Sequence, residues 1–255
     1  MLIATWNINS IRARETRLLD WLQSRQPDVL CIQELKAPEQ EFPFESLQQY
    51  GYYAAVFGQK TYNGVAILAR SEPEDVESGF GDDTDDVQAR FIAATVDGVR
   101  ILSTYVPNGE RVRSEKYIYK INWLYRLRTY LKDHTLLTGP VAICGDLNIA
   151  PEERDIANPD AWEGSVLFNP DVRAEFRSLL SMGFMDTFRL HEAESGYYSW
   201  WDYRNRGFER NDGLRIDHIL VSRELSPQCT AARIDREARE GEKPSDHAPV
   251  LAVFD

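Results

Sequence analysis

The stretch Pro140-Val-Ala-Ile-Cys-Gly145-Asp146-Leu-Asn148-Ile-Ala-Pro151 predicts a buried β-strand that ends in polar residues. The residues from Val141 to Cys144 are all apolar, which is typical of a strand covered on both faces. Gly145 allows another backbone to approach closely. Because side chains two residues apart in extended backbone point the same way, we expect Asp146 and Asn148 to face one point beyond the strand. The alternative is an Asx turn, the more common role of Asp and Asn after a strand.

The same pattern, an apolar strand that ends in polar residues, recurs elsewhere in the chain. Residues 2–6 predict a strand that is followed by Asn7, and Val29–Ile32 predict one that is followed by Gln33 and Glu34. Side chains at such ends form one site if the sheets bring the ends together. The candidate site residues at these ends are Asn7, Glu34, Tyr105, Asp146 with Asn148, Asp217, and Asp246 with His247.

Strands and helices alternate along the chain, and several connections are hairpins. Asp97-Gly98 favours a tight turn between two strands, and Asn63-Gly64 lies in the loop of a second hairpin. Ser10 is a candidate N-cap for a helix that ends before Pro27. We therefore predict an α/β layered fold with mixed sheets, and a single domain covering residues 1–255, because no repeat or linker divides the chain. The predicted strands are 2–6, Val29–Ile32, Tyr52–Phe57, Val65–Leu68, Phe91–Val96, Val99–Val106, Val141–Cys144, Tyr197–Tyr203, Arg215–Val221 and Ala248–Phe254; further helices are predicted at about Ser114–Asp133 and at Asp171–Met182, and a loop at 150–170.

Composition argues against several classes of protein. No apolar run approaches the roughly 18 residues of a membrane span, and residues 2–6 read as a strand and not as a signal peptide, so we predict a cytoplasmic protein without membrane attachment. Cys31, Cys144 and Cys229 are predicted to be reduced, buried thiols. The formal net charge of −12 is not that of a basic nucleic-acid binder. Arginine clusters can still create positive fields locally, although each cluster can equally be a solvated face.

The strand-end residues suit the hydrolysis of a phosphodiester. Glu34 and Asp246 offer carboxylate oxygens and Asn7 offers a carbonyl, which are ligands for Mg²⁺ or Mn²⁺. Hydrolysis also needs an oriented and deprotonated water, for which a buried Asp146 can serve as the base. His247 is suited to bind the phosphate, and beside a carboxylate it stays protonated.

Each of these residues has a structural alternative. A lone Glu34 or Asn7 is more often a helix cap or a turn residue, and a lone histidine more often lies on the surface or in the core. Asp217 is harder to explain in this way, because it lies in the apolar stretch Leu214–Val221 and burying an unpaired charge is costly. The joint pattern, and no single residue, favours a catalytic site.

Seven short blocks of sequence carry a more specific signal. They are Thr5-Trp-Asn-Ile-Asn-Ser-Ile-Arg-Ala-Arg14, Ile32-Gln-Glu-Leu-Lys36, Tyr105-Val-Pro-Asn-Gly109, Gly145-Asp-Leu-Asn-Ile-Ala-Pro151, Ser199-Trp-Trp-Asp-Tyr-Arg204, Gly213-Leu-Arg-Ile-Asp217 and Lys243-Pro-Ser-Asp-His-Ala-Pro-Val250. In this order they resemble the signature blocks of the exonuclease III family of abasic-site endonucleases, within the endonuclease/exonuclease/phosphatase superfamily. The catalytic blocks alone fit the wider superfamily, whereas the blocks beginning at Ser199 and Gly213 are similar to exonuclease III itself.

The resemblance implies a four-layer α/β sandwich, in which two mixed sheets pack face to face and helices cover the outer faces. It implies that Glu34 is the main ligand of a Mg²⁺ or Mn²⁺ ion. The residues that it places at or near this metal are Asn7, Glu34, Asp146, Asn148 and Asp246. The catalytic roles that it implies are proton transfer by Asp146, contacts to water or phosphate by Asn148, Tyr105 and His247, and orientation of His247 by Asp217.

The resemblance also implies contacts to DNA. Trp200, Leu214 and Ile216 match positions that line a small apolar pocket for a flipped-out sugar without its base, a pocket that discriminates by shape. Without the resemblance, the paired tryptophans would be read as core residues. Arg90 matches a residue that meets the DNA backbone. Further candidates for phosphate contacts are Arg12, Lys116, Lys120, Arg204 and Arg206.

The expected function is a Mg²⁺-dependent DNA repair hydrolase that cleaves the phosphodiester on the 5′ side of an abasic site in double-stranded DNA. Trimming of 3′ nucleotides and of blocked 3′ ends is expected beside it, by a monomer. The main alternative is a relative specialised for 3′ ends, as a 3′-phosphatase or an exonuclease. A non-catalytic binding module is disfavoured because no key group is lost. A phospholipid or inositol-phosphate phosphodiesterase is disfavoured because nothing indicates membrane attachment.

Overall fold

The computed structural model of the protein describes residues 1–82, 84–135 and 139–255. Within these ranges, two six-stranded mixed sheets form the centre of the molecule. The first sheet has the order β13-β14-β1-β2-β4-β3 and consists of β1 (Leu2–Asn7), β2 (Val29–Gln33), β3 (Tyr53–Phe57), β4 (Val65–Ala69), β13 (Cys229–Ile234) and β14 (Val250–Phe254). The second has the order β5-β6-β7-β8-β12-β9 and consists of β5 (Glu74–Ser78), β6 (Phe91–Val96), β7 (Val99–Tyr105), β8 (Val141–Asp146), β9 (Met185–Asp186) and β12 (Asp217–Val221). The strands β10 (Trp200–Trp201) and β11 (Gly213–Leu214) pair separately.

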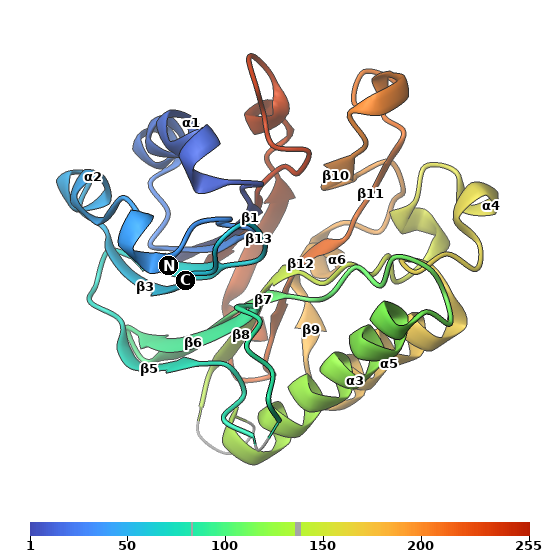
Figure 1. Ribbon diagram of the computed structural model, residues 1–255, viewed down its shortest axis with the longest axis horizontal. Helices are drawn as coiled ribbons and strands as arrows, with labels where there is room; N and C mark the ends of the chain where they lie inside the picture. Colours follow the sequence, from blue (N-terminus) through green and yellow to red (C-terminus); the bar gives the residue numbers. More distant parts are fainter. Residues whose placement is uncertain (83, 136–138) are drawn as a thin grey trace.

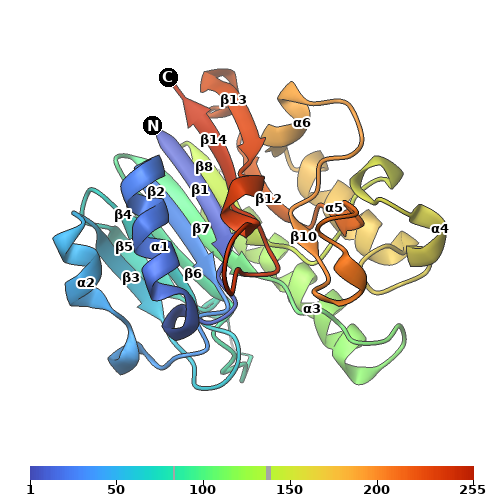
Figure 2. The ribbon, with the colours of Figure 1, turned by 90° about the horizontal axis from the view of Figure 1, so that it is seen from above.

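The two sheets pack face to face, and helices cover their outer faces (Figure 1, Figure 2). Helices α1 (Ile11–Arg25) and α2 (Phe44–Gln49) lie outside the first sheet, and α3 (Glu115–Tyr130) and α5 (Pro170–Ser181) lie outside the second. Two shorter helices are α4 (Pro159–Trp162) and α6 (Thr187–His191). Ile3 and Ile67 of the first sheet and Ile101 of the second are fully buried in one shared core. The predicted four-layer α/β sandwich is therefore confirmed.

The first strand of the chain occupies a central place in its sheet. Ala4 of β1 lies opposite Leu251 of antiparallel β14 on one side and beside Leu30 of parallel β2 on the other. The amino group of Met1 donates a 2.5 Å hydrogen bond to the carbonyl oxygen of Phe254, so the two ends of the sequence lie side by side (Figure 1). The pairs β1–β2 and β7–β8 are parallel, so the carboxyl ends of the strands in each pair meet at one edge of their sheet.

The predicted turns and caps are confirmed in part. Asp97 and Gly98 both have positive φ, 47° and 79°, as a tight hairpin between β6 and β7 requires. Ser114 caps α3, because its hydroxyl accepts a 3.2 Å hydrogen bond from the amide of Tyr117. Ser10 does precede α1, but its side chain makes no capping hydrogen bond. Its amide instead donates to the carbonyl oxygen of Glu34 at 2.8 Å, which ties the start of α1 to the end of β2.

Several boundaries differ from the prediction. The predicted strand Tyr197–Tyr203 is wrong in extent, since only Trp200 and Trp201 pair, and the predicted loop at 150–170 contains α4 and a 3₁₀ turn at Glu153–Asp155. The helix predicted to reach Asp133 ends at Tyr130 and continues as a π-helical turn. Strand β5 was not predicted, because it is a fully exposed edge strand without an apolar face. The three cysteines are free and buried, as predicted. Searching the described ranges finds no helix with the length and apolar character that crossing a membrane requires.

Candidate active site

The polar strand ends converge at one edge of the sandwich. Tyr105 lies beside Asp146 in the parallel pair β7–β8, and Asp217 lies opposite Asp146 in the antiparallel pair β8–β12. Gly145 makes this crowding possible, because a Cβ there would lie 1.9 Å from the carbonyl oxygen of Thr104. The close backbone approach predicted for Gly145 is confirmed.

Glu34 follows β2 in a backbone conformation that is uncommon for a residue other than glycine. Its φ of 55° lies in the left-handed region, where strain is typical of functional positions. The side-chain nitrogen of Asn7, Nδ2, donates to Glu34 Oε1 at 2.9 Å, and the Tyr105 hydroxyl donates to the same oxygen at 2.8 Å. Lys36 Nζ lies 2.7 Å from Oε2. Burial alone would raise the pKa of Glu34, but the charge of Lys36 and the hydrogen bond from Asn7 lower that pKa, so Glu34 is ionised at neutral pH.

Asp146 ends β8 in a buried position. Asn7 Nδ2 donates to Asp146 Oδ2 at 3.0 Å, and the backbone amide of Asn148 donates to Asp146 Oδ1 at 2.9 Å. Burial raises the pKa of Asp146 to about 7; the charge of His247 opposes this rise and the charge of Asp217 adds to it. A carboxylate with a pKa near neutrality can both accept and return a proton, which a general acid–base catalyst must do.

His247 pairs with Asp217. His247 Nδ1 lies 2.8 Å from Asp217 Oδ2, and the hydroxyl of Ser199 donates to the same oxygen at 2.7 Å. Burial alone would lower the pKa of His247, but the carboxylates of Asp217 and Asp146 raise that pKa to about 10, so the ring is positively charged at neutral pH. Ser199 is a site residue that the sequence reasoning missed. Its only signal was its place immediately before Trp200 in one of the seven blocks.

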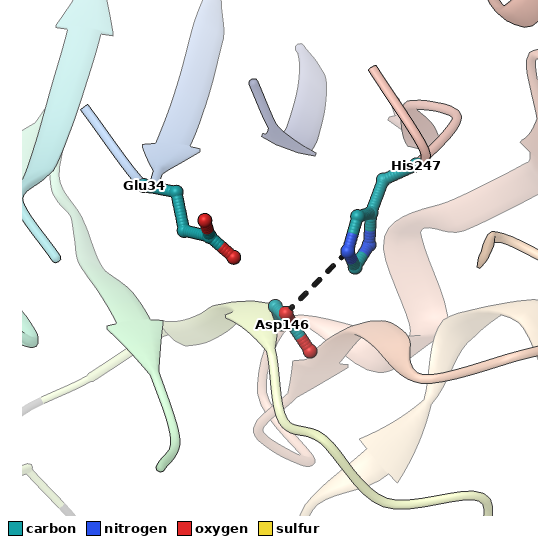
Figure 3. A group of neighbouring side chains, drawn as sticks. All are labelled: Glu34, Asp146 and His247. Atoms are coloured by element: carbon teal, nitrogen blue, oxygen red, sulfur yellow. Dashed lines mark ion pairs between the residues drawn. The ribbon is translucent and has the colours of Figure 1, made fainter. Parts of the chain in front are cut away.

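Two of these side chains, Glu34 and Asp146, could hold a metal ion, and protonated His247 lies beside them. Among the described residues, Glu34, Asp146 and His247 bring ligand atoms within 4.8 Å of one another, and they reach from three separate segments toward a common space (Figure 3). His247 Nε2 and Asp146 Oδ2 are 3.8 Å apart. Two carboxylates, one of them ionised, match the oxygen ligands that hard divalent cations prefer. Asp246 lies outside this group, because its carboxylate accepts hydrogen bonds from Asn9 at 2.8 Å and Trp200 at 3.0 Å; its place near a metal stays a prediction.

The structure corrects the reasoning about the two asparagines. Asn7 turns its amide nitrogen toward Glu34 and Asp146, and its oxygen accepts a 3.0 Å hydrogen bond from the amide of Asn9. It therefore holds the two carboxylates in place, and its own place near a metal stays a prediction. Asn148 is not in extended backbone, since its φ is 50° and its amide closes a turn on Asp146. The alternative of an Asx turn is correct, and this turn still brings Asp146 and Asn148 to one cavity.

A cavity of about 610 Å³ includes these residues and continues into an apolar wall. Trp200 and Ile216 lie on this wall, as the resemblance implied. Trp162 of α4 extends it and meets Trp200 edge to face, with ring centres 6.0 Å apart. Leu214 is not among the residues that line the cavity. It is 1% exposed and pairs with Trp200 in the β10–β11 ladder, so it supports the wall from behind.

The residues predicted to contact DNA phosphates occupy different positions. Arg90 stacks on Tyr105, with its guanidinium carbon 4.7 Å from the ring centre, and donates a 3.3 Å hydrogen bond to the carbonyl oxygen of Tyr105. It therefore fixes the backbone and ring of a site residue, whatever else it contacts. The exposed candidates, for which a contact with DNA stays a prediction, are Arg12, Lys116, Arg204 and Arg206.

The prediction that Lys120 contacts DNA is wrong. Its side chain is fully buried on the inner face of α3, with 0% of its surface exposed. The ammonium group donates hydrogen bonds to the carbonyl oxygens of Asn108, Asn148 and Val166, at 3.1, 2.7 and 2.7 Å. Burial lowers the pKa of Lys120 to about 7, an effect that the charge of Asp146 partly opposes. A cluster of basic residues in the sequence does not reveal which of them face inward.

Arg215 is a second buried cation, to which the sequence reasoning gave no role. It is 1% exposed, and its guanidinium pairs with Asp155 at 2.7 Å and Asp186 at 2.8 Å. Its amide also donates to the carbonyl oxygen of Asp155 at 2.9 Å. Because Ile216 is the next residue, this network fixes the cavity wall against the 3₁₀ turn Glu153–Asp155.

We expect the Arg215 network to make the fold sensitive to acid. Burial alone would raise the pKa of Asp186, but the charge of Arg215 holds that pKa well below its usual range. An acid with a depressed folded-state pKa contributes its full stability above the unfolded value of about 3.9 and loses it as the pH falls toward the folded value. Asp186→Asn should therefore lower the free energy of unfolding by about 3–5 kcal/mol near neutral pH, because it leaves Arg215 buried without one partner.

Urea unfolding of the wild type and of D186N at a series of pH values measures this effect. The difference between the two proteins should shrink steadily below about pH 4. Asp20→Asn on the exposed side of α1 is the matched control and should change stability by less than about 0.5 kcal/mol. A difference between D186N and wild type that is the same at every pH would contradict the role assigned to the ionised carboxylate.

Comparison with known proteins agrees with this fold and site. Residues 4–247 match the model of the Endonuclease/Exonuclease/phosphatase family. The chain is 38% identical to Exodeoxyribonuclease III of Haemophilus influenzae over 266 aligned residues, which cover all of both chains. A solved structure of the 3′ phosphatase NExo (D146N) from Neisseria bound to product DNA hairpin is 42% identical, with a TM-score of 0.97 over 100% of this chain and 99% of that one. An AP endonuclease from Archaeoglobus fulgidus is 40% identical, with a TM-score of 0.94 and the same coverage. The chain therefore belongs to the endonuclease/exonuclease/phosphatase family and, as its sequence blocks indicated, to the exonuclease III type of DNA repair nuclease within it.

Proposed function

We propose that the protein is a metal-dependent DNA repair hydrolase that cleaves the phosphodiester on the 5′ side of an abasic site and leaves a 3′-hydroxyl. Removal of 3′ nucleotides and of 3′ phosphates accompanies this activity. The enzyme acts as a monomeric, single-domain protein of the cytoplasm on double-stranded DNA. The observation that carries the proposal is the cavity in which the apolar wall of Trp200 and Ile216 adjoins the charged pair Asp146 and His247.

This arrangement matches the chemistry of a sugar without a base. A normal nucleotide brings a base that is too large for a small apolar pocket, whereas a baseless sugar is small enough to enter it. When the sugar rests against Trp200 and Ile216, its phosphate lies toward the positive charge of His247. The wall then selects the lesion, and the charged residues act on the phosphodiester beside it.

The side chains divide the reaction among them. Protonated His247 donates a hydrogen bond to a phosphate oxygen, and Asp217 keeps it oriented through the 2.8 Å contact. Burial raises the pKa of Tyr105 well above its usual value, so its hydroxyl stays protonated, and it donates to the phosphate when it turns away from Glu34. Asp146 accepts a proton from the attacking water and returns one to the leaving 3′ oxygen. A Mg²⁺ or Mn²⁺ ion held by Glu34 and Asp146 supplies positive charge to the phosphate and its leaving oxygen when it is bound.

A second candidate function is the processing of 3′ ends with little incision at internal abasic sites. The likeness to the 3′ phosphatase NExo, at 42% identity over the whole chain, favours it. The edge-to-face contact between Trp162 and Trp200 is also consistent with it, since this contact narrows the apolar part of the cavity. The metal-binding and catalytic residues would be the same for both functions.

Cleavage of defined duplexes separates the two candidates. The substrates are a duplex with one internal abasic analogue, an undamaged duplex and a duplex with a 3′ phosphate, each with Mg²⁺ and with chelator. Incision at the internal lesion that requires metal supports the abasic-site function. Metal-dependent removal of the 3′ phosphate without internal incision assigns the protein to 3′-end processing, and absence of both activities would overturn both proposals.

A further inference from the structure

Lys120 joins three separate loops that line the catalytic cavity. We define them as the 106–114 loop, the 147–152 loop and the 163–169 loop. The ammonium group of Lys120 does not face solvent. It donates one hydrogen bond to a backbone carbonyl oxygen in each loop, at Asn108, Asn148 and Val166. The side chains of Asn108, Asn148 and Val166 all line the cavity. Lys120 therefore lies behind the cavity wall, on the side away from the substrate.

The chemistry of the ammonium group suits this position. In its protonated form, lysine offers three N–H donors and no acceptor, which matches three converging carbonyl oxygens. A buried carbonyl without a partner costs about 1–3 kcal/mol, and three that point at one another also repel. An apolar side chain at position 120 would leave all three oxygens in this state, so the loops would have to move apart to reach water. The backbone contact between the amide of Ala150 and the carbonyl oxygen of Leu167, at 2.9 Å, links two of the loops but does not replace the missing donors.

The loops carry a side chain on which the reaction depends. Asn148 lies two residues after Asp146. Its side-chain nitrogen Nδ2 donates to the carbonyl oxygen of Val106 at 2.9 Å, and its side-chain oxygen accepts a hydrogen bond from Asn108 at 3.2 Å. These contacts fix Asn148 only while the 106–114 loop and the 147–152 loop keep their separation. That separation is set by the two hydrogen bonds from Lys120.

We propose that Lys120 is a positioning residue, which acts by fixing the three cavity loops and thereby orients Asn148 toward the reacting phosphate. The inference rests on the proposed function in one point, the contact to water or phosphate that the resemblance to exonuclease III implies for Asn148. Glu34 and His247 are held by other contacts, from Asn7, Tyr105 and Asp217. The proposal therefore separates turnover, which depends on Lys120, from metal binding, which does not.

Lys120→Met keeps the length of the side chain and removes its donors, so it is the main test. In steady-state cleavage of the duplexes described above, K120M should lower kcat by about 10- to 100-fold, because a shift of about 1 Å in a positioning group has this effect. KM for DNA and the metal concentration at half-maximal activity should change by less than about threefold, because Trp200 and Ile216 lie outside the three loops and Glu34 is held by Asn7 and Tyr105. Lys120→Arg keeps the charge and the donors and should recover part of the lost turnover. Lys132→Met, at an exposed position beyond the end of α3, is the matched control and should leave kcat unchanged.

Hydrogen exchange provides a readout that does not require an active enzyme. In K120M, the amides of residues 106–112, 147–151 and 164–168 should exchange faster, whereas those of α1 and β2 should exchange as in the wild type. Wild-type exchange in these loops together with wild-type kcat would overturn the proposal. If K120M is unfolded at the assay temperature, K120R is the test. Slow exchange in the three loops together with retained turnover supports the proposal, and slow exchange together with lost turnover contradicts it. If the wild type cleaves none of the duplexes, the proposed function fails, and the exchange data still decide whether Lys120 fixes the loops.

Discussion

Replacing Asp146 with Asn should reduce cleavage of every DNA substrate by at least about a thousandfold while the protein stays folded. The carboxamide has nearly the shape of the carboxylate, but it cannot accept the proton of the attacking water, a step that contributes about 10²- to 10⁴-fold. It also removes one of the two negative charges available to a metal ion. Both losses act on the same chemical step, so the effect lies near the upper end of this range.

The same substitution should not lower stability, and this separates chemistry from folding. Burial raises the folded-state pKa of Asp146 to about 7, above its unfolded value of about 3.9. An acid with a raised folded-state pKa makes the fold less stable as the pH rises between these two values, because the unfolded chain ionises first. In chelator above about pH 7, D146N should therefore be at least as stable as the wild type.

Cleavage assays and urea unfolding in parallel check this prediction, with Asp20→Asn as the control that keeps both properties. Residual turnover within about tenfold of wild type would exclude Asp146 as the base. A large loss of stability in D146N would instead point to a structural role for the ionised carboxylate.

Replacing Glu34 with Gln should weaken metal binding by at least about 100-fold. Changes to residues that only support a metal ligand cost about 10- to 100-fold, so loss of a charged ligand should cost at least as much. The carboxamide oxygen can still accept the hydrogen bonds that Asn7 and Tyr105 give to the carboxylate. The pocket shape should therefore survive, and turnover should recover in part at high metal concentration.

Calorimetric titration with Mg²⁺ and Mn²⁺ measures the affinity directly, and the rise of the unfolding temperature with metal concentration measures it independently. Glu39→Gln, at an exposed site five residues further on, is the matched control and should bind metal like the wild type. Unchanged affinity in E34Q would show that the metal site does not depend on Glu34, and the assignment of this group would fail.

The central strand and its polar end could be predicted because the signals are local. An unbroken apolar run such as Val141–Cys144 can only be a covered strand or a short helix, and Gly145 and Pro151 decide between them. Convergence of Glu34, Asp146 and His247 could not be derived from local patterns, because it depends on strand order. The resemblance of seven blocks to a known family implied this convergence, and the structure brings the three side chains together.

The errors came from contacts that are distant in the sequence. Lys120 and Lys116 lie on one helix and look alike in the sequence, yet Lys120 is fully buried against three loop carbonyls and Lys116 forms an exposed pair with Glu110. Arg215 belongs to a cluster of arginines in the sequence and had no assigned role, and only its pairing with Asp155 and Asp186 shows that it is buried. Helix and strand propensities carry no information on such pairs. A basic residue that lies among the apolar residues of a predicted element is therefore first expected to be buried and paired.

The central place of β1 has a consequence for synthesis on the ribosome. This strand is among the first to leave the exit tunnel, but one of its two neighbours, β14, is formed by residues 250–254. The 3.1 Å hydrogen bond from Trp6 of β1 to the carbonyl oxygen of His247 therefore forms only after residue 247 has emerged. A nascent chain that has exposed β1, β2 and β8 already contains Glu34 and Asp146, yet it lacks His247. Glu34, Asp146 and His247 can therefore converge only after the segment that ends in β14 has joined the first sheet.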